Sequence, residues 1–177
     1  MTAPVVIVDY NPRWPLLYEQ EMKLIHRVLG SRIKAIEHIG STAIPNLGGK
    51  NIIDIMVGVS NVDEANECLL PLESIGYKVV TPQGDNAEWY YCLGKDQQAG
   101  YHLHLVKFSS EHWNRHLLFR DFLRKNPQVS KEYYNLKKEL AAKYGTDRLG
   151  YTEAKTMFIE STIARGKLIA STELVRG

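Results

Sequence analysis

Hydrophobic and polar positions change their spacing near residue 109. Before this point, short apolar runs of the kind found in strands alternate with stretches whose apolar residues recur every three or four positions. After it, only the helical spacing is present, almost to the end of the chain. Because side chains repeat every two residues in a strand and about every 3.6 in a helix, the pattern predicts an α/β part followed by a helical part.

The first part predicts five strands and two helices. The strands, which are rich in β-branched and aromatic residues, are expected at 33–39, 52–59, 77–80, 88–93 and 101–108. The last two flank a polar connection, residues 94–100, as in an antiparallel hairpin. The helices are expected at 16–29 and 63–75, where Gly30 and Gly76 follow as stop signals.

The second part predicts three helices, each with a Ser or Thr that could cap its N-terminus, at 110–124, 130–144 and 152–167. Together the elements predict an α+β fold in which a small mixed β-sheet has helices on one side. We expect an α/β core over residues 1–108 and a helical subdomain over residues 109–177, with the ligand between them.

Composition supports an ordinary packed domain. The chain has 177 residues, of which 44% are hydrophobic and 24% charged, so neither a disordered chain nor a multidomain protein is expected. Residues 1–107 carry 9 basic and 12 acidic residues, a sum of −3, and residues 108–177 carry 13 and 8, a sum of +5. The basic surplus is weak support for an anionic partner, and it is spread too widely for us to expect nucleic acid.

The two cysteines, Cys68 and Cys92, lie in apolar stretches without metal-type spacing. The sequence shows neither a signal peptide nor a long apolar span. We therefore expect buried free thiols, a cytoplasmic protein and no membrane partner.

The stretch from His38 to Val59 carries the first candidate chemistry. Gly40 allows a backbone turn to approach a ligand closely, and Ser41 and Thr42 offer hydroxyl and N–H groups that could hold phosphate oxygens if a helix begins there. Asp54 interrupts an apolar strand, where an unpaired carboxylate is costly, so it should have a cation, a metal or a strong donor beside it.

The strand 101–108 supplies candidate partners for Asp54. His102 and His104 are two residues apart and therefore lie on one strand face, a spacing that allows both to share one metal ion with a carboxylate from a neighbouring strand. His38 could be a fourth member of the set. The alternatives are a structural salt bridge of Asp54 with Lys50 or a buried Arg, and hydrogen bonds of the two histidines across the hairpin.

These residues carry a resemblance to a known family. Gly-Ser, a loop and an acidic residue in the next strand resemble the signature of the polymerase-β-type nucleotidyltransferase superfamily. More closely, five blocks in order resemble the bacterial GrpB-like family: EHIGSTAIPNLGGKNIIDIMV, HLHLV, LLFRDFLRKNP, YYNLKKELAAKYG and YTEAKTMFI. The resemblance implies the nucleotidyltransferase fold over nearly the whole chain, with a nucleotide ligand and a divalent metal ion.

The chain departs from the pattern that this resemblance implies. Superfamily enzymes carry a second carboxylate two residues after the first, and here that position is Met56. The place of a third carboxylate is taken by His102 and His104. Asn46 and Asn51 stand where the GrpB-like pattern has Gly and Pro. Imidazole favours softer metals than Mg²⁺, so a standard two-magnesium site is in doubt and the metal could be Mg²⁺, Mn²⁺ or Zn²⁺.

Three basic residues are candidate phosphate ligands. Lys50 ends the loop before the second strand and could neutralise a phosphate or remain solvated. Arg120 could approach a phosphate from the helical part or bridge the two parts of the fold. Lys155, one helical turn after Tyr151, could also bind phosphate. The pair Lys137 and Lys138, and the histidines His26, His112 and His116, are expected on solvated helix faces.

The resulting hypothesis is metal-dependent nucleotidyl transfer from a nucleotide or another phosphorylated small molecule. Asp54, His102 and His104 would be the catalytic and metal-binding residues, with His38 as a further metal ligand. The ligand would be held by Gly40, Ser41, Thr42, Lys50, Arg120 and Lys155. The alternatives are a non-catalytic nucleotide- or metabolite-binding module on the same fold, and a metal-dependent phosphohydrolase. The acceptor and the oligomeric state do not follow from the sequence.

Overall fold

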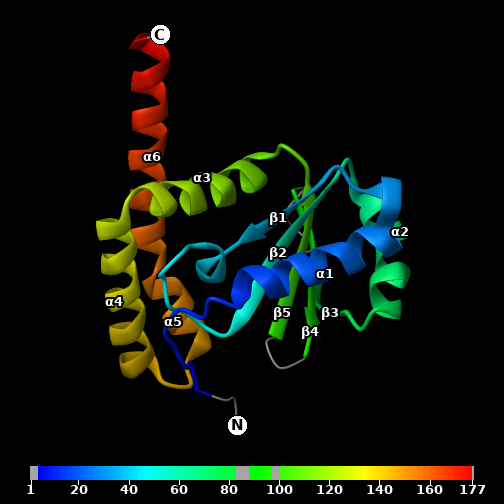
Figure 1. The fold of residues 1–177 in the computed structure, drawn as a ribbon, viewed down its shortest axis with the longest axis horizontal. Helices are drawn as coiled ribbons and strands as arrows, with labels where there is room; N and C mark the ends of the chain where they lie inside the picture. The colour runs from blue at the N-terminus through cyan, green and yellow to red at the C-terminus, as the bar shows by residue number, and fades with distance from the viewer. Residues whose placement is uncertain (1–3, 83–87, 97–99, 177) are drawn as a thin grey trace.

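A mixed five-stranded sheet forms the centre of the protein. The computed structural model describes residues 4–82, 88–96 and 100–176. The strands are β1 (Ala35–Ile39), β2 (Ile52–Val59), β3 (Lys78–Pro82), β4 (Trp89–Lys95) and β5 (Gly100–Lys107). They lie in the order β1-β2-β5-β4-β3, in which β2 and β5 are parallel and the other neighbours antiparallel (Figure 1). The expected mixed sheet and the β4–β5 hairpin are confirmed, while residues 97–99 of the expected connection lie outside the described residues.

Six α-helices and two short 3₁₀ turns are present in the described ranges. The helices are α1 (Trp14–Leu29), α2 (Val62–Ser74), α3 (Glu111–Lys125), α4 (Pro127–Tyr144), α5 (Arg148–Ala154) and α6 (Thr156–Arg176). The 3₁₀ turns are η1 (Gly30–Arg32) and η2 (Ser41–Ala43). The second of these turns follows Gly40, so a short 3₁₀ turn stands where an α-helix was one possibility.

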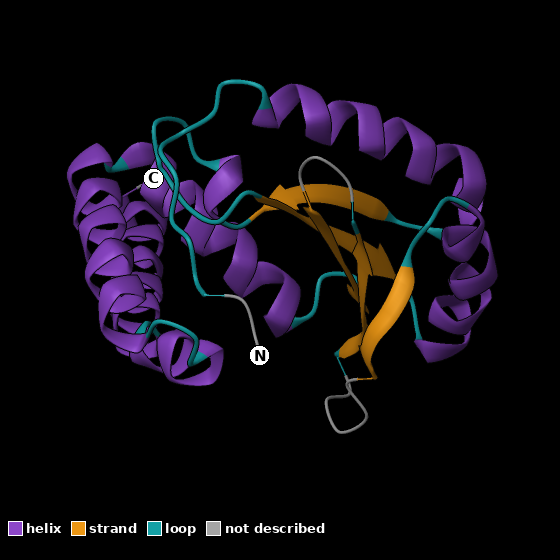
Figure 2. Ribbon diagram, turned by 90° about the horizontal axis from the view of Figure 1, so that it is seen from below, coloured by secondary structure: helices purple, strands orange, loops and turns teal. Residues whose placement is uncertain are grey.

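Helices lie on both sides of the sheet rather than on one side as expected (Figure 2). The alternation of β2 explains the two layers, since Ile53, Ile55 and Val57 point to the face that α1 and α2 cover. Met56 points to the opposite face, where it packs with Trp113 of α3. The sheet is therefore buried on both faces around β2.

The helical part differs from the sequence prediction at two boundaries. α4 begins at Pro127, because proline suits the first turn of a helix, and Ser130 is buried inside it rather than capping it. The single helix expected at 152–167 is two helices, α5 and α6, separated at Lys155. The cap expected at Ser110 is confirmed, since its Oγ accepts a hydrogen bond from the Trp113 N–H at 3.2 Å.

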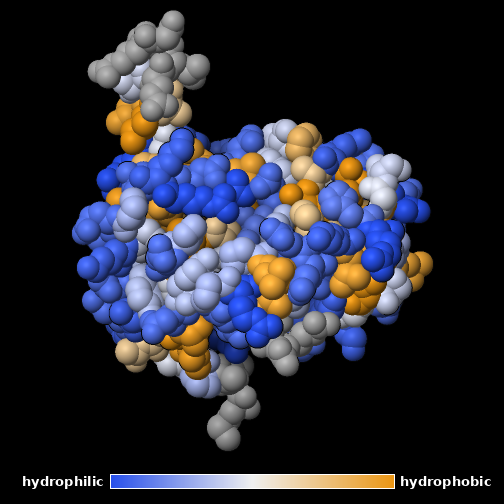
Figure 3. Space-filling view, viewed as in Figure 1, coloured by the Kyte–Doolittle hydropathy of each residue, from blue (hydrophilic) through white to orange (hydrophobic). Residues whose placement is uncertain are grey.

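The segment before α1 lies against the C-terminal helices. The Val5 N–H donates to the Gly145 carbonyl oxygen at 3.0 Å, and the Tyr134 hydroxyl donates to the Asp9 carboxylate. Val5 and Asp9 therefore contact the helical part, and the division at residue 108 stays a prediction. The C-terminal part of α6 extends beyond the other helices (Figure 1 and Figure 3). Leu168 of this helix is 69% exposed.

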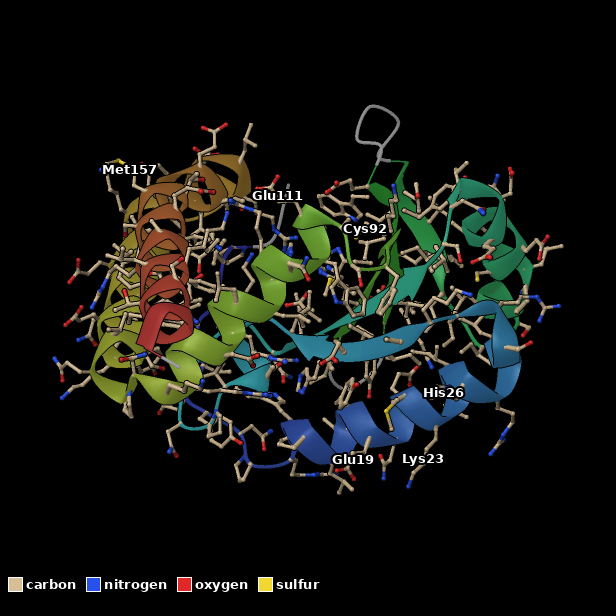
Figure 4. All side chains as sticks on the ribbon, turned by 90° about the horizontal axis from the view of Figure 1, so that it is seen from above. Glu19, Lys23, His26, Cys92, Glu111 and Met157 are labelled. Atoms are coloured by element: carbon tan, nitrogen blue, oxygen red, sulfur yellow. The ribbon has the colours of Figure 1, made fainter. Side chains whose placement is uncertain are left out.

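Residues without an expected chemical role lie mostly where the sequence predicts. His26 lies with Glu19 and Lys23 along the exposed side of α1, as predicted (Figure 4). Cys68 is fully buried, but Cys92 is only partly buried, so the expectation of two buried thiols holds for one of them. Among the described residues, no helix is both long enough and apolar enough to cross a membrane.

Candidate functional site

The candidate site begins where the turn after β1 meets β2. Gly40 has φ 72° and ψ −173°, a conformation that is essentially restricted to glycine. A Cβ built on Gly40 would lie 2.5 Å from Oδ2 of Asp54, so the absence of a side chain lets the turn lie directly against this carboxylate. Gly40 therefore positions the turn and Asp54 relative to each other.

Asp54 faces two imidazoles from the neighbouring parallel strand. β2 and β5 are in register at Asp54 and His102, and the period of two places His104 on the same face. Oδ1 of Asp54 lies 3.6 Å from Nδ1 of His102 and 3.7 Å from Nε2 of His104. Burial raises the pKa of Asp54, but the two imidazoles outweigh burial and hold that pKa well below its usual range.

His38 does not join this group, contrary to the prediction. In the antiparallel pairing of β1 with β2 it stands opposite Ile55, and so it points to the α1 side of the sheet. Its Nε2 lies 3.0 Å from Oγ1 of Thr42, and its ring stacks on Tyr18 at 4.5 Å between centroids. Burial lowers the pKa of His38 to about 4, so the ring is neutral near pH 7.

The contact between His38 and Thr42 also bears on the prediction that Thr42 binds phosphate. Its hydroxyl is engaged with His38, and its side chain is buried. Ser41 is different, because it is partly exposed and its Oγ lies 2.7 Å from Nζ of Lys137. The partly exposed hydroxyl of the turn is therefore that of Ser41, while Thr42 supports the turn from the side of the sheet that α1 covers.

Lys137, expected on a solvated helix face, is a buried residue of the site. It is 3% exposed, and its Nζ also donates to the Gly48 carbonyl oxygen at 2.5 Å. Burial, with a smaller effect of Lys155, lowers the pKa of Lys137 to about 7. The spacing of Lys137 from Ser130 and Tyr133, which places the three on one helix face, was the signal available in the sequence.

The amines of Lys50 and Lys155 both lie close to the ring of Tyr151. Nζ of Lys50 lies 4.9 Å and Nζ of Lys155 4.3 Å from the ring centroid of Tyr151, a side chain that is fully buried. Burial and then Lys50 lower the pKa of Lys155 to about 8, and burial and then Arg148 lower the pKa of Lys50. The break between α5 and α6 places Lys155 at this position.

Arg120 lies outside the pocket and bridges two elements, which corrects its assignment as a ligand residue. Its Nη1 donates to Oε2 of Glu37 at 2.6 Å and to the His38 carbonyl oxygen at 3.0 Å. Arg124, one turn later, donates through Nε and Nη2 to the Ala43 carbonyl oxygen at 2.9 and 2.8 Å. Both arginines therefore attach α3 to β1 and the η2 turn.

The collected residues enclose a pocket of about 450 Å³ between the sheet and the helical part. Its polar lining includes Ser41, Asp54, His102, His104 and the three lysines. Its apolar and aromatic lining comes from the helices: Phe119, Tyr133, Tyr151, Ile159 and Ile163. Of the predicted ligand residues, Gly40, Ser41, Thr42, Lys50, Asp54, His102, His104 and Lys155 line this pocket.

Two histidines of α3 lie closer to the site than the sequence predicts. His116 lines the pocket, and its ring lies 4.5 Å from that of His112. His112 stacks on Trp89, which in turn contacts the His104 ring at 5.3 Å. Burial and then His116 lower the pKa of His112 to about 4. Burial also lowers the pKa of His116, so both partly buried rings near His104 favour the neutral form.

The described residues do not confirm the predicted divalent-metal site. Met56, which replaces the second carboxylate, is fully buried against Ile39, Val106 and Trp113. Among the side chains that the structure describes, no group of three or more His, Cys, Asp and Glu is arranged to hold a metal ion. The metal site of Asp54, His102 and His104 therefore stays a prediction.

Comparisons with known proteins show the family and the fold. The GrpB protein family model matches residues 4–165. The glutamate-rich protein GrpB of Alkalihalophilus pseudofirmus is 36% identical over 165 residues, which cover 90% of this chain and 94% of that protein. The conserved protein GrpB from Enterococcus faecalis has a solved structure with a TM-score of 0.79 and 31% identity, covering 91% of this chain and 96% of that one.

A more distant likeness extends to nucleotidyltransferases. The structure of Cid1 in complex with the UTP analogue UMPNPP has a TM-score of 0.54 and 15% identity, and the match covers 76% of this chain and 42% of that one. At this identity the likeness shows the fold, which is nucleotidyltransferase-like. The chain belongs to the GrpB family.

Proposed function

We propose that this GrpB-family chain binds the phosphate groups of a nucleotide or another phosphorylated small molecule in the pocket. The main support for this proposal is that three lysines from separate segments line the pocket: Lys50, Lys137 and Lys155. Burial is the main cause that lowers the pKa values of all three lysines, and the charge of a neighbouring lysine adds to it at Lys137 and Lys155. An anionic ligand offsets this cost by stabilising the protonated amines of Lys50 and Lys155.

The shape of the pocket supports a ligand with an aromatic or apolar part attached to its phosphates. The three lysines line the pocket together with aromatic side chains such as Phe119 and Tyr133, and Nζ of Lys137 lies 4.8 Å from the ring centroid of Tyr133. A volume of about 450 Å³ falls in the usual range for small-molecule sites. The Cid1 structures, which hold a UTP analogue in one case and the ApU product in the other, support a nucleotide as that ligand.

Nucleotidyl transfer is the activity we propose for the bound nucleotide. Asp54 stays ionised and orients His102 and His104, whose rings contribute hydrogen-bond donors beside the ligand. Lys50 and Lys155 neutralise the charge that develops on the leaving phosphate groups, which is how electrostatic stabilisation lowers the barrier of phosphoryl transfer. A divalent metal, if bound, would supply further neutralisation of the phosphates. Phosphate release without an acceptor would instead identify a phosphohydrolase.

Calorimetry tests the binding proposal. Metal-stripped protein is titrated with UTP, ATP and, as a phosphate-free control, uridine. We expect the triphosphates to bind and uridine to bind much more weakly. Lys155→Met should weaken triphosphate binding about tenfold, which corresponds to one lost charge-assisted contact. Lys138→Met is the matched control, because Lys138 lies over Tyr134 outside the pocket. Equal binding of uridine, or an unchanged Lys155→Met variant, would contradict the proposal.

The metal requirement is measured on the same samples. Mg²⁺, Mn²⁺ and Zn²⁺ are titrated with and without triphosphate into wild type, Asp54→Asn and His104→Ala. Tight binding of one metal that both substitutions abolish would establish the predicted metal site. If Asp54→Asn instead strengthens triphosphate binding in metal-free buffer, the carboxylate acts there as a repulsive neighbour of the phosphates. Pyrophosphate release and transfer to added acceptors are then assayed under the condition that binds best.

A further inference from the structure

Ser41 and Lys137 form a close polar pair in the wall of the pocket. Nζ of Lys137 lies 2.7 Å from Oγ of Ser41 and 2.5 Å from the Gly48 carbonyl oxygen. Ser41 is partly exposed to the pocket, whereas Lys137 is 3% exposed. A Cβ on Gly49 would lie 2.8 Å from Cβ of Ser41 and 3.2 Å from Nζ of Lys137, so the glycine makes room for this contact.

The groups around Lys137 decide its protonation. Burial is the main cause that lowers its pKa to about 7, and Lys155 and Lys50 act in the same direction, while Asp54 opposes them. The ring of Tyr133, from the same helix, lies 4.8 Å from Nζ, and burial raises the pKa of this phenol, so it carries no charge near pH 7. A large share of Lys137 is therefore neutral at pH 7 or above. A neutral amine can accept the Ser41 proton while it still donates to Gly48.

The other aliphatic hydroxyls of the pocket have different partners. In the described part of the chain, Thr42 pairs with His38, and Thr152 donates to the Arg148 carbonyl oxygen at 2.9 Å. Ser41 differs because its partner is an amine that can take up a proton. In addition, Met56 occupies the position of the second carboxylate that, in the two-metal arrangement, helps to activate an attacking hydroxyl.

We propose that Ser41 is a nucleophile and Lys137 its general base, acting on a phosphorus atom of the bound ligand. The proposal rests on the proposed function, which brings a phosphorylated ligand to the pocket. As Oγ of Ser41 forms a bond to phosphorus, the bond from phosphorus to the leaving oxygen breaks, and the hydroxyl proton moves to Nζ of Lys137. A nucleoside triphosphate would leave phosphoserine with a nucleoside diphosphate, or nucleotidyl-serine with pyrophosphate. Lys137 then returns its proton to the leaving oxygen or to water.

A fluorophosphonate probe tests the nucleophile without knowledge of the natural ligand. In the labelling step a bond from Oγ of Ser41 to phosphorus forms, the phosphorus–fluorine bond breaks, and fluoride leaves. We expect one label for each chain, mapped to Ser41 by peptide mass spectrometry, and none in Ser41→Ala. Ser60→Ala, which changes an exposed serine, should label as wild type does. Absence of a label at Ser41 would overturn the proposal.

The base is tested by charge-preserving substitution and by pH. Lys137→Arg keeps a cation near the phosphates but cannot accept a proton, so labelling should slow about 100-fold. Lys138→Arg is the neighbouring control and should not change the rate. In wild type the rate should rise with pH through about 7, where Lys137 loses its proton. An unchanged rate in folded Lys137→Arg, or a rate that does not rise with pH, would show that Lys137 acts only as a cation.

Two readouts keep this inference separate from the proposed function. If the triphosphates bind in calorimetry but Ser41 is not labelled, the nucleophile is wrong and the binding site stands. If Ser41 is labelled but no triphosphate binds, the nucleophile is supported and its ligand is not a nucleoside triphosphate. If neither occurs, both proposals fail. Because the wild-type pH profile needs no variant, the test remains decisive even if Lys137→Arg fails to fold.

Discussion

Gly40 and Asp54 are in such close contact that a Cβ on the glycine would lie 2.5 Å from Oδ2 of the carboxylate. This relationship joins the turn that we propose to bind phosphate to the acidic residue of β2, although the two residues lie fourteen positions apart in the sequence. The positive φ of Gly40 and the absent side chain are both required for it. The turn and the carboxylate therefore act as one unit of the site.

Gly40→Ala should disrupt this unit. The added Cβ must displace the Asp54 carboxylate and also adopt a backbone conformation that alanine rarely takes, so we expect a loss of about 2–4 kcal/mol in the free energy of unfolding. Triphosphate binding should be lost as well. Gly30→Ala is the matched control, because Gly30 also has a positive φ but has no atom within 4 Å of a built Cβ.

Urea unfolding and calorimetry separate the two effects. Gly30→Ala should be less stable than wild type by about 1–2 kcal/mol, which is the cost of the backbone strain alone, and should bind triphosphate normally. A Gly40→Ala variant that binds as tightly as wild type would mean that the turn does not hold the ligand.

Lys155→Met should change how stability depends on pH. The pKa of Lys155 is about 8 in the folded protein and near its ordinary value of 10.5 in the unfolded chain. Between these values the unfolded chain binds more protons, so this lysine makes wild type more stable as pH rises through that window. In Lys155→Met this part of the rise should be absent, as measured by thermal unfolding at several pH values.

The protonation of Lys155 should also make triphosphate affinity depend on pH, in the direction opposite to that of stability. A phosphate ligand favours the protonated lysine, so triphosphate binding should take up protons near pH 8 and weaken as pH rises further. Calorimetry in two buffers of different ionisation enthalpy measures this uptake. Lys155→Met should take up fewer protons, and Lys138→Met should behave as wild type. Equal uptake in all three proteins would exclude Lys155 as a phosphate ligand.

Arg120→Met should affect stability rather than binding. The guanidinium is nearly buried and bonds to Glu37 and to the His38 carbonyl oxygen, so its removal leaves these acceptors without a charged donor. We expect a loss of about 2–3 kcal/mol in the free energy of unfolding and little change in triphosphate affinity. Arg115→Met provides the comparison, since its partner Glu160 is half exposed and the loss should be below about 1 kcal/mol. If Arg120→Met instead lost much of its triphosphate affinity and kept its stability, Arg120 would be a ligand-binding residue after all.

Met56→Asp should not create a two-carboxylate site. Met56 is fully buried among Ile39, Val106 and Trp113, apolar surroundings in which an ionised carboxylate is costly. We expect a loss of about 3 kcal/mol or more in urea unfolding, and no gain in Mg²⁺ affinity. Met56→Leu, which keeps the volume and the apolar character, should cost less than about 1.5 kcal/mol. A stable Met56→Asp protein with new Mg²⁺ affinity would contradict this reading of the buried face.

Sequence patterns were sufficient for relationships within a single strand or turn. The period of two in β2 placed Asp54 and Met56 on one face, and the same period in β5 placed His102 and His104 together. These relationships hold because an extended backbone fixes the direction of alternate side chains whatever surrounds it. The resemblance to the GrpB-like family, which rests on five short sequence blocks, also predicted the nucleotidyltransferase-like fold.

Packing between elements decided the rest of the site. The antiparallel register of β1 turned His38 away from Asp54, and the placement of α4 buried Lys137 beside Ser41. The break between α5 and α6 placed the Lys155 amine over Tyr151, and the position of α3 let Arg120 bind Glu37 of β1. The sequence by itself determined which residues share a face of an element. Only the tertiary structure decided which faces meet, because register and helix placement depend on contacts between residues far apart in the chain.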